Sequence, residues 1–340
     1  MKAIQVIGTQ RSGSNLLRLM LDQLDEISSP HPPHILRTFM PLVPLYGSLE
    51  DDDNFKRLID DVCRLVELNP VPWLDVHLDR EAIFRRSDQR TLCKVNELVY
   101  LLKAEADGAQ FWCCKSMANV HYAAQLEESG IRPYYIHLYR DGRDVALSFK
   151  KAVVGHKHVY HIARQWALDQ DRSLELHETL GSRRVIGISY EHLLASPRQT
   201  LTAICAFLGV KYSDQALSYY QSEEASNTAK SGKMWENVVK PILVKNTCKY
   251  RGQLSAEEIR IFESVAGSTL QRLGYSLDFP DSPKLVFTEE QIMAFDRENS
   301  ILRKEAKKLI TPAELRSREK QESLVAEIRL RETSYSTTTP

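Results

Sequence analysis

The 340-residue sequence predicts an α/β fold, with a central parallel sheet flanked by helices and a helical extension at the C-terminus. Short apolar runs alternate with longer amphipathic runs, which is typical of a parallel sheet covered by helices. A glycine-rich turn joins the first apolar run to the first amphipathic one. The composition changes after residue 279, so we expect a core domain over residues 1–279 and a charged extension over residues 280–340.

The apolar runs and the helical periodicity locate the elements of the core. The expected strands lie near residues 2–8, 110–115, 133–139 and 184–189. The expected helices cover residues 14–25, 54–68, 95–107, 142–153, 160–179, 198–208 and about 255–272. The first helix therefore follows the first strand directly, and the last opens at the capping box Ser255-Ala256-Glu257-Glu258.

The extension contains two further helix starts. Pro280 and Pro283 mark the break from the core, and helices are expected to begin at Thr288-Glu289-Glu290-Gln291 and Thr311-Pro312-Ala313-Glu314. Residues 313–333 hold many charges and few apolar positions, which predicts a solvated helix on the surface. The end, Thr337-Thr338-Thr339-Pro340, is expected to be disordered.

Composition narrows the class of protein. Forty-five basic and forty-five acidic residues balance, so no global field would hold the chain on nucleic acid or an anionic membrane, and any anion must be bound locally. No apolar run is long enough to span a bilayer, and the start of the chain reads as a strand rather than a signal peptide. Six scattered cysteines suggest reduced thiols and a cytoplasmic protein. The oligomeric state is not predicted.

The segment Gly8-Thr9-Gln10-Arg11-Ser12-Gly13-Ser14-Asn15 predicts an anion site between the first strand and helix. Its spaced glycines let backbone N–H groups and the helix N-terminus face one anion, as in a nucleotide-triphosphate loop, and so predict a three-layer, P-loop-like fold. Ser14 and Asn15 replace that loop's lysine and its magnesium-binding hydroxyl residue, which disfavours a metal-dependent NTPase. Arg11 can supply the positive charge instead, which suits a phosphosulfate. The alternative is a plain glycine turn that caps a helix.

A second anion site is predicted after the strand at 134–139. That strand delivers Arg140 to the carboxyl edge of the sheet, where open α/β folds bind ligands. Ser148 lies about two helical turns further on and can face the same anion. The alternative is a surface ion-pair cluster around Asp141, Arg143 and Asp144.

Together these segments resemble the sulfotransferases that use 3′-phosphoadenosine 5′-phosphosulfate (PAPS). The stretch from Arg11 to Arg18 resembles the family's 5′-phosphosulfate loop, and residues 140–148 its 3′-phosphate motif. Residues 189–210 are similar to its downstream signature, and the resemblance extends over roughly residues 3–275. Cys114-Lys115-Ser116 and the segment 249–252 look closest to the tyrosylprotein sulfotransferases and their bacterial relatives.

The resemblance implies which residues hold the donor, without a metal. The 5′ side would be bound by Arg11, Ser12, Gly13, Ser14, Asn15 and Leu16. The 3′-phosphate and the nucleotide would be bound by Arg140, Ser148 and Tyr190, with Lys249 as a further cofactor ligand. Lys115 would act on the transferring sulfuryl group.

The sequence departs from that branch where a glutamate pair is expected after the first helix. Residues 28–34 instead read Ser-Ser-Pro-His-Pro-Pro-His, with no carboxylate. A neutral histidine can accept a hydroxyl proton at pH 7, so we expect His31 or His34 to be the base, with His31 preferred. Two histidines without chemistry in a proline-rich turn are the alternative, and the fallback bases are the acidic residues at 51–53 and Glu97.

The sequence also contains a histidine-rich segment and four tryptophans. The segment 156–161 holds three histidines, but its spacing is unlike a metal site, and we expect a solvated or substrate-facing loop. Trp112 and Trp166 fall in strand and helix patterns and are expected in the core, whereas Trp235 is the candidate for a lid over the cofactor.

The function predicted is therefore in-line transfer of a sulfuryl group from PAPS to a hydroxyl-bearing acceptor, with no nucleic-acid partner and no integral membrane association. Peptide tyrosine, carbohydrate and small alcohol remain open as acceptors, because segments 37–90 and 152–182 carry no recognisable motif. Two alternatives stand beside it. One is a kinase on the same nucleotide-loop architecture, and the other is a nucleotide-binding protein without catalysis.

Overall fold

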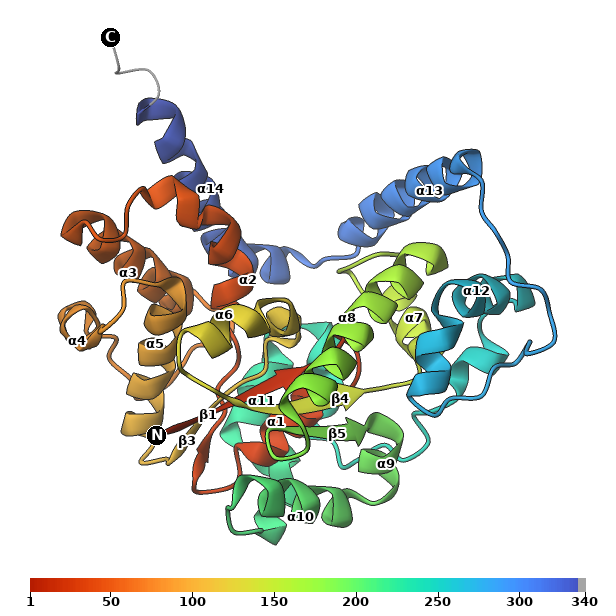
Figure 1. The fold of residues 1–340 in the computed structure, drawn as a ribbon, viewed down its shortest axis with the longest axis horizontal. Coiled ribbons are helices and arrows are strands. Elements are labelled where there is room, and N and C mark those ends of the chain that lie inside the picture. The colour runs from red at the N-terminus through yellow and green to blue at the C-terminus, as the bar shows by residue number, and fades with distance from the viewer. Residues whose placement is uncertain (336–340) are drawn as a thin grey trace.

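The computed structural model describes residues 1–335 and contains one five-stranded parallel sheet in that range. The strand order is β2-β3-β1-β4-β5 (Figure 1). The strands are β1 (Lys2–Ile7), β2 (Ile27–Ser28), β3 (Phe111–Cys114), β4 (Tyr134–Tyr139) and β5 (Val185–Ser189). The four strands expected from the sequence are present, and the two-residue β2 was not predicted.

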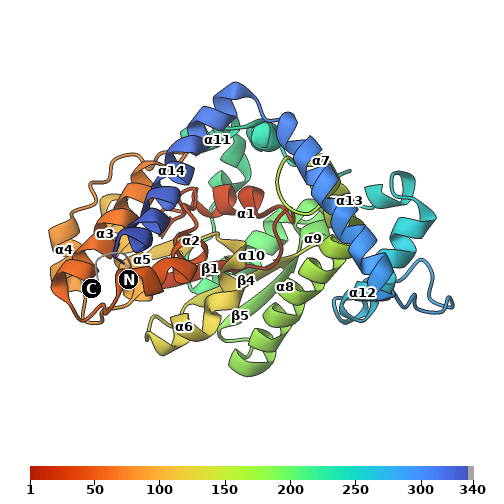
Figure 2. The same cartoon turned by 90° about the horizontal axis from the view of Figure 1, so that it is seen from above.

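Helices cover both faces of the sheet. The α-helices of the core are α1 (Ser14–Leu21), α2 (Ile35–Phe39), α3 (Asp52–Glu67), α4 (Arg80–Arg86), α5 (Leu92–Ala106), α6 (Ala123–Glu128), α7 (Gly142–Lys151), α8 (Val159–Leu180), α9 (Tyr190–Ala195), α10 (Pro197–Leu208), α11 (Glu223–Lys230) and α12 (Ala256–Arg272). Short 3₁₀ helices are η1 (Met40–Tyr46), η2 (Met117–Tyr122), η3 (Asp214–Gln221), η4 (Lys233–Val239) and η5 (Lys249–Gly252). In Figures 1 and 2, α6 and α8 lie on one face of the sheet and α1, α10 and α11 on the other. This is the three-layer α/β arrangement that the sequence predicts.

The core forms because the strands are apolar on both faces, as a sheet covered by helices requires. Ile4 and Val6 are fully buried on one face of the sheet, and Ile7 and Tyr135 are fully buried on the other. Trp112 and Trp166 are buried at 1% and 0% exposure, which confirms their assignment to the core. No described helix is both long enough and apolar enough to span a membrane.

The C-terminal extension forms two long helices, α13 (Glu289–Lys308) and α14 (Pro312–Tyr335). The capping box predicted at Thr288 is present at the start of α13. Figures 1 and 2 show α13 beside α7 and α8, and α14 crossing to the opposite side, next to α2 and α3. The predicted disorder of residues 337–340 concerns positions outside the described residues.

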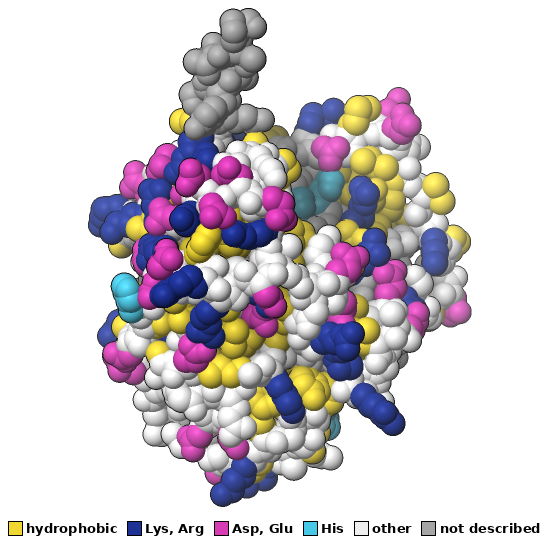
Figure 3. Space-filling model, turned by 60° about the vertical axis from the view of Figure 1, so that its left-hand side comes forward, with side chains coloured by type: hydrophobic (Ala, Val, Ile, Leu, Met, Phe, Trp, Pro, Cys, Tyr) yellow, Lys and Arg dark blue, Asp and Glu magenta, His cyan; other side chains and the backbone are white. Residues whose placement is uncertain are grey.

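Residues 313–333 lie in a helix, as expected, and most of its described side chains are exposed, but one face is not solvated. Leu324 and Ile328 of α14 are each 2% exposed and belong to the apolar cluster around α3 and α5. These two side chains lie four residues apart and therefore share one face of the helix. The helix is charged on its remaining faces, and the view in Figure 3 shows basic and acidic side chains mixed over the surface, in keeping with the zero net charge.

Candidate active site

A cavity of about 670 Å³ lies where the parallel strands end. Loops that follow β1, β3, β4 and β5 each contribute to its lining, as expected for an open α/β sheet. The predicted site residues that line it are Arg11, Gly13, Ser14, Asn15, Leu16, His31, His34, Lys115, Arg140, Ser148, Tyr190 and Lys249. Ser12 is the exception, because its side chain is buried beneath the loop. Segments far apart in the sequence thus converge on one cavity.

The loop between β1 and α1 has the backbone that its glycines permit. Gly8 and Gly13 have φ of 122° and 84°, values that residues other than glycine rarely adopt. A Cβ on Gly13 would lie 2.3 Å from the ring of Tyr190. The loop therefore wraps the N-terminus of α1 with Tyr190 packed directly against it. This is more than the plain helix-capping turn that the sequence left open.

The two predicted anion sites form one continuous basic surface. Arg11 Nε donates a hydrogen bond of 3.0 Å to Ser148 Oγ, and Arg140 Nη1 donates one of 3.3 Å to the Arg11 carbonyl oxygen. The Arg140 guanidinium also lies over the Tyr190 ring, 4.6 Å from its centre. Burial and the positive charge of Arg140 lower the pKa of Arg11. Two guanidinium groups held this close favour a ligand with several negative charges.

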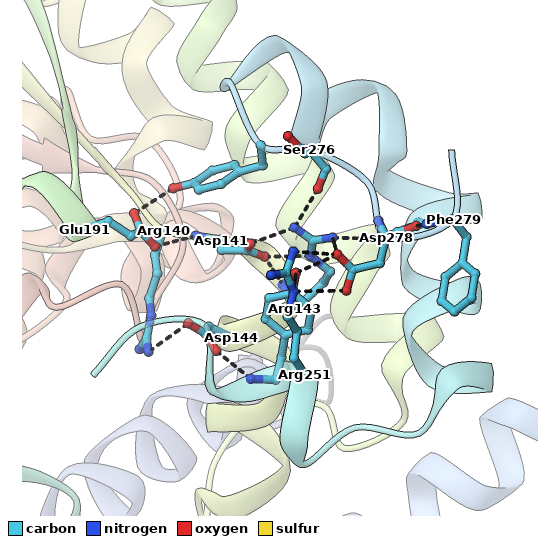
Figure 4. A network of polar contacts seen from close by, with 12 residues as sticks. Arg140, Asp141, Arg143, Asp144, Glu191, Arg251, Ser276, Asp278 and Phe279 are labelled. Atoms are coloured by element: carbon cyan, nitrogen blue, oxygen red, sulfur yellow. Dashed lines mark hydrogen bonds and ion pairs between the residues drawn. The ribbon is translucent and has the colours of Figure 1, made fainter. Parts of the chain in front are cut away.

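Arg140 is held from behind by buried acidic groups (Figure 4). Its Nη2 lies 3.6 Å from a carboxylate oxygen of Asp144 and donates to the Asn246 carbonyl oxygen at 2.8 Å. The other carboxylate oxygen of Asp144 accepts from the backbone N–H of Tyr250 at 2.9 Å. Asp144 therefore links Arg140 to the segment that carries Lys249.

The neighbouring Arg143 is structural and is not part of a surface ion-pair cluster. Its guanidinium donates to both carboxylate oxygens of Asp141 and, at 2.6 Å, to Glu263 of α12 (Figure 4). Asp141, Arg143 and Asp144 are only 6%, 2% and 1% exposed, so the surface alternative is wrong. Buried pairs of this kind hold their partners in one arrangement, and here they join α7 to α12 behind the cavity.

Lys115 follows β3 and points its amine into a basic environment. It is 8% exposed, and burial together with the charges of Arg18 and Arg11 lowers the pKa of its ammonium to about 7. An amine in this state gains strongly from an anion beside it, because the anion stabilises the protonated form.

The segment 28–34 places both predicted histidines at the cavity. The side-chain NH₂ of Asn69 donates to the His31 carbonyl oxygen at 3.1 Å and lies 3.4 Å from His31 Nδ1. Trp235 packs edge-on against the His31 ring at 5.2 Å. His34 Nδ1 lies 3.0 Å from Ser116 Oγ, directly after Lys115.

Both histidines are neutral at physiological pH. Burial, helped by the charge of Lys115, lowers the pKa of His31 well below its usual value. Burial, Lys115 and Arg37 lower the pKa of His34 to about 3. His31 Nε2 is buried and has no hydrogen-bond partner among residues 1–335, so a ligand could satisfy this atom.

Arg18 is a supporting residue to which sequence reasoning assigned no role. It is fully buried, and its Nη1 donates to the Ser29 carbonyl oxygen at 2.9 Å and to Glu224 of α11 at 2.7 Å. It therefore ties the histidine segment to the region that carries Trp235. The signal was a charged residue on the apolar face of α1, between Leu17 and Leu21.

The remaining residues that the sequence suggested as bases or as a substrate-facing loop lie outside the cavity. Asp51 caps α3, Asp52 pairs with Arg90, and Glu97 pairs with Lys94, so none of them lines the cavity and they are wrong as fallback bases. The histidine segment 156–161 was expected to be a solvated or substrate-facing loop. It packs against α13 instead, where Asn299 Oδ1 accepts from the backbone N–H of Lys157 at 2.8 Å, and none of its residues lines the cavity. Among residues 1–335, no group of three or more His, Cys, Asp or Glu side chains is arranged to hold a metal ion.

The cavity fits a phosphosulfate nucleotide. Arg140 Nε, at the cavity, and Ser12 Oγ, beneath the loop, are buried donors without a hydrogen-bond partner among the described residues. Such atoms are rarely left unpaired in a folded protein unless a ligand or water satisfies them. Lys115 and Lys249 add positive charge to the same lining. Phosphate and sulfate oxygens are the partners that these donors suit.

Comparison with known proteins decides the family. The sulfotransferase family model matches residues 3–214. The chain belongs to the sulfotransferase family. This confirms the resemblance drawn from the loops at residues 11–18 and 140–148, and it leaves the kinase alternative without support.

Individual sulfotransferases show how far the likeness extends. The chain is 21% identical over 277 residues to protein-tyrosine sulfotransferase A of Caenorhabditis elegans, covering 79% of this chain and 66% of that protein. It is 27% identical over 99 residues to protein-tyrosine sulfotransferase 2 of Gallus gallus, covering 28% of this chain. The chain thus spans a little under two thirds of the first relative and 26% of the second.

Solved sulfotransferase structures share the fold. The sulfotransferase domain from the Synechococcus PCC 7002 olefin synthase is 25% identical with a TM-score of 0.50, covering 78% of this chain and 94% of that domain. The sulfotransferase domain from the curacin biosynthetic pathway is 20% identical with a TM-score of 0.52, covering 81% and 98%. Both likenesses confirm the predicted architecture.

Proposed function

We propose that this sulfotransferase moves a sulfuryl group from PAPS to an acceptor hydroxyl. The observation that carries the proposal is that Arg11, Arg140 and Lys115 converge on one cavity built by the strand ends. PAPS would supply an activated sulfuryl group on its 5′-phosphate. The cavity volume of about 670 Å³ is within the range of small-molecule sites.

The proposed role of each residue follows from its position in the cavity. The loop at 11–16 would bind the 5′-phosphosulfate with its N–H groups and with Arg11, because helix N-termini and guanidinium groups both favour anions. Arg140 and Ser148 would bind the 3′-phosphate, with Tyr190 and Lys249 along the nucleotide. Lys115 would stabilise the negative charge on the sulfuryl oxygens as the bond to phosphate breaks. Trp235, which lines the same cavity, would cover the site.

The hydrogen bonds support His34, rather than the preferred His31, as the base that takes the acceptor proton. Asn69 directs an N–H toward His31 Nδ1, so the proton of neutral His31 belongs on Nε2 and that atom can only donate. Ser116 Oγ can accept from Nδ1–H of His34, which leaves a lone pair on His34 Nε2. His31 would then donate a hydrogen bond into the site, and His34 would accept the proton.

The first experiment measures donor binding. Calorimetry with 3′-phosphoadenosine 5′-phosphate (PAP) in the presence of a chelator should show binding, and ATP should bind more weakly. Labelled PAPS with a panel of phenols, sugars and alcohols should then show transfer of label. Equal or tighter binding of ATP, or a strict magnesium requirement, would overturn the donor assignment. Donor binding without any transfer would instead favour the nucleotide-binding alternative.

The second experiment tests the base. His34→Ala should bind PAP normally and lose about 10²- to 10⁴-fold in turnover, which is the usual contribution of a general base. A more acidic phenol should partly restore turnover in this variant but not in Lys115→Met, since Lys115 acts on the sulfuryl group. His31→Ala is the matched comparison. If this variant loses more turnover than His34→Ala, and a more acidic phenol restores it, His31 rather than His34 is the base.

The acceptor and the compartment stay open. The C. elegans relative is a protein-tyrosine sulfotransferase by name, and its acceptor class is one of three that the panel covers. We also propose that residues 1–279 form the sulfotransferase domain and that 280–340 are an addition to it. The six cysteines are unpaired, and five of them are buried, which supports a reducing, cytoplasmic setting for the chain.

A further inference from the structure

The C-terminal helix α14 is fixed against the core in one register. Leu324 and Ile328 are buried in the cluster around α3, and Gln321 Nε2 donates to the Leu65 carbonyl oxygen at 2.7 Å. The guanidinium of Arg331 binds Asp61, a carboxylate that is only 1% exposed, at 2.6 Å. Apolar and polar contacts therefore agree on the same docking, and the face that α14 turns to its surroundings is defined.

One face of α14 forms part of the cavity lining. Arg318, Gln321 and Glu322 line it together with His31, His34 and Arg37. These α14 positions are three and four residues apart and so share a face. They lie outside residues 3–214, the part of the chain that the family model matches. The wall at this end of the cavity thus belongs to the extension of this chain.

Two guanidinium groups line this end of the cavity, those of the exposed Arg37 and the half-buried Arg318. The charge of Arg318 acts on Glu314 one helical turn earlier, whose pKa is lowered mainly by the backbone N–H of Thr311 and also by Arg318. Neither Arg37 nor Arg318 forms an ion pair or a hydrogen bond within residues 1–335, although both line the cavity. Glu322 lines it too, but its carboxylate pairs with neither of them. By contrast, the donor end of the cavity has its own cations in Arg11 and Arg140. The positive charge at Arg37 and Arg318 therefore exceeds what the donor requires.

We infer that Arg318 of α14 and Arg37 of α2 bind a carboxylate on a small hydroxyl-bearing acceptor. The inference rests on the proposed sulfuryl transfer and adds the chemical class of the acceptor. Guanidinium groups bind carboxylates through paired, charge-assisted hydrogen bonds, which no other group at this end offers. A cavity of about 670 Å³ that must hold donor and acceptor together, with α14 along one side, favours a small acceptor over a folded one.

The charge around His34 supports the same reading. Arg37 is one of the groups whose positive charge lowers the pKa of His34. A carboxylate bound at Arg37 would offset that charge and raise the basicity of His34 when the acceptor is in place. The acceptor would in this way improve the base that deprotonates it.

The test uses acceptors in matched pairs that differ only in charge. The full chain would be assayed with labelled PAPS on 4-hydroxyphenylacetate against 4-hydroxyphenylacetamide, and on 3-hydroxybutyrate against 3-hydroxybutyramide. The carboxylate of at least one pair should have the higher kcat/KM. In Arg318→Ala, kcat/KM for that carboxylate should fall about ten- to a hundredfold, with little change for the amide. In Arg37→Ala the ratio of kcat/KM for the carboxylate to that for the amide should fall by a similar factor, whatever the change in basicity of His34 does to both rates. Arg316→Ala, on the exposed part of the same helix, is the matched control and should leave the preference unchanged.

Donor binding separates this inference from the proposed function. All variants should bind PAP as the parent chain does, and a chain that does not bind PAP contradicts the proposed function itself. Should no pair be turned over, the same compounds would be titrated into the PAP-bound chain. Equal use or binding of carboxylate and amide, a preference that survives both arginine substitutions, or faster sulfation of an acidic tyrosine peptide would each overturn the inference.

Discussion

Lys115 should take up a proton when the donor product PAP binds. Burial and the charges of Arg18 and Arg11 lower the pKa of its ammonium to about 7 in the free protein. A phosphate beside the amine favours the charged form, so the pKa in the complex must be higher. Between these two values the free protein has lost the proton and the complex holds it. Binding therefore takes up a proton in this window, and affinity falls as the pH rises through it.

The size of the effect follows from the pKa. At pH 8, one unit above the pKa of Lys115, about 0.9 of the free molecules have a neutral amine, so uptake should approach about 0.9 proton per PAP. Above pH 7, the affinity for PAP should fall about tenfold with each further pH unit, until the pH reaches the pKa of Lys115 in the complex. His31 and His34 are neutral throughout this range and add nothing. Phosphate monoesters have lost their second proton by pH 8 and add nothing either.

Calorimetry at pH 8 in two buffers of different ionisation enthalpy measures the uptake directly. Lys115→Met keeps the length of the side chain and removes the titrating group, so its uptake should vanish and its PAP affinity should become flat between pH 7 and 9. The variant also separates Lys115 from Lys157, whose ammonium is bound to the carbonyl oxygens of Phe149 and Val154. Enthalpies that do not depend on the buffer in the parent chain would refute the assignment of Lys115 to the anion site.

The remaining predictions address the loop, the nucleotide site and the extension. Gly13→Ala should lower PAP affinity at least tenfold by calorimetry, because its Cβ would lie 2.3 Å from the Tyr190 ring at a backbone φ of 84°; unchanged affinity would contradict the packing of that ring on the loop. Arg140→Ala should weaken PAP about ten- to a hundredfold but adenosine 5′-phosphosulfate only slightly, and an equal loss for both would remove it from the 3′-phosphate. Leu324→Ala should destabilise the docking of α14 by about 2–5 kcal/mol. The loss should be measured as faster amide hydrogen exchange in α14, with exchange in β1 unchanged. Equal protection of α14 in the variant and the parent protein would mean that the helix is not held by its apolar face.

The elements with a strong period were predictable from sequence, and the short ones were not. Apolar strand runs and amphipathic helices of ten or more residues leave a pattern that outlasts local exceptions. The strand Ile27–Ser28 is too short to show any period, and it exists because its backbone pairs with β3. The order of the strands could not be predicted either, because β1 pairs with β3 and β4, each more than a hundred residues further along the chain.

The loop between β1 and α1, where we propose that the donor binds, was predictable for a physical reason. Binding a phosphate requires a loop of defined backbone directly after a strand, so the glycines and Arg11 stand together in the sequence. The docking of α14 at the cavity could not be predicted, because the apolar residues that dock it, Leu324 and Ile328, stand in a sequence that is otherwise rich in charged residues. Its contacts with Asp61 and Leu65 join positions more than 250 residues apart. Only the folded chain brings Arg318 to the cavity.

The two ends of the cavity are thus built in different ways, and this bears on how acceptor choice can change. The donor end is formed by loops at the strand ends, so altering it alters the sheet edge that holds the fold together. The proposed acceptor end is formed by α2, the segment around Asn69 and the face of α14, which lie away from the strand ends. Side chains on that wall can change with little effect on the sheet or on PAPS. The proposed division of the cavity therefore predicts that substitutions on that wall alter the choice of acceptor and leave PAP affinity unchanged, whereas substitutions in the loops after β1 and β4 alter PAP affinity.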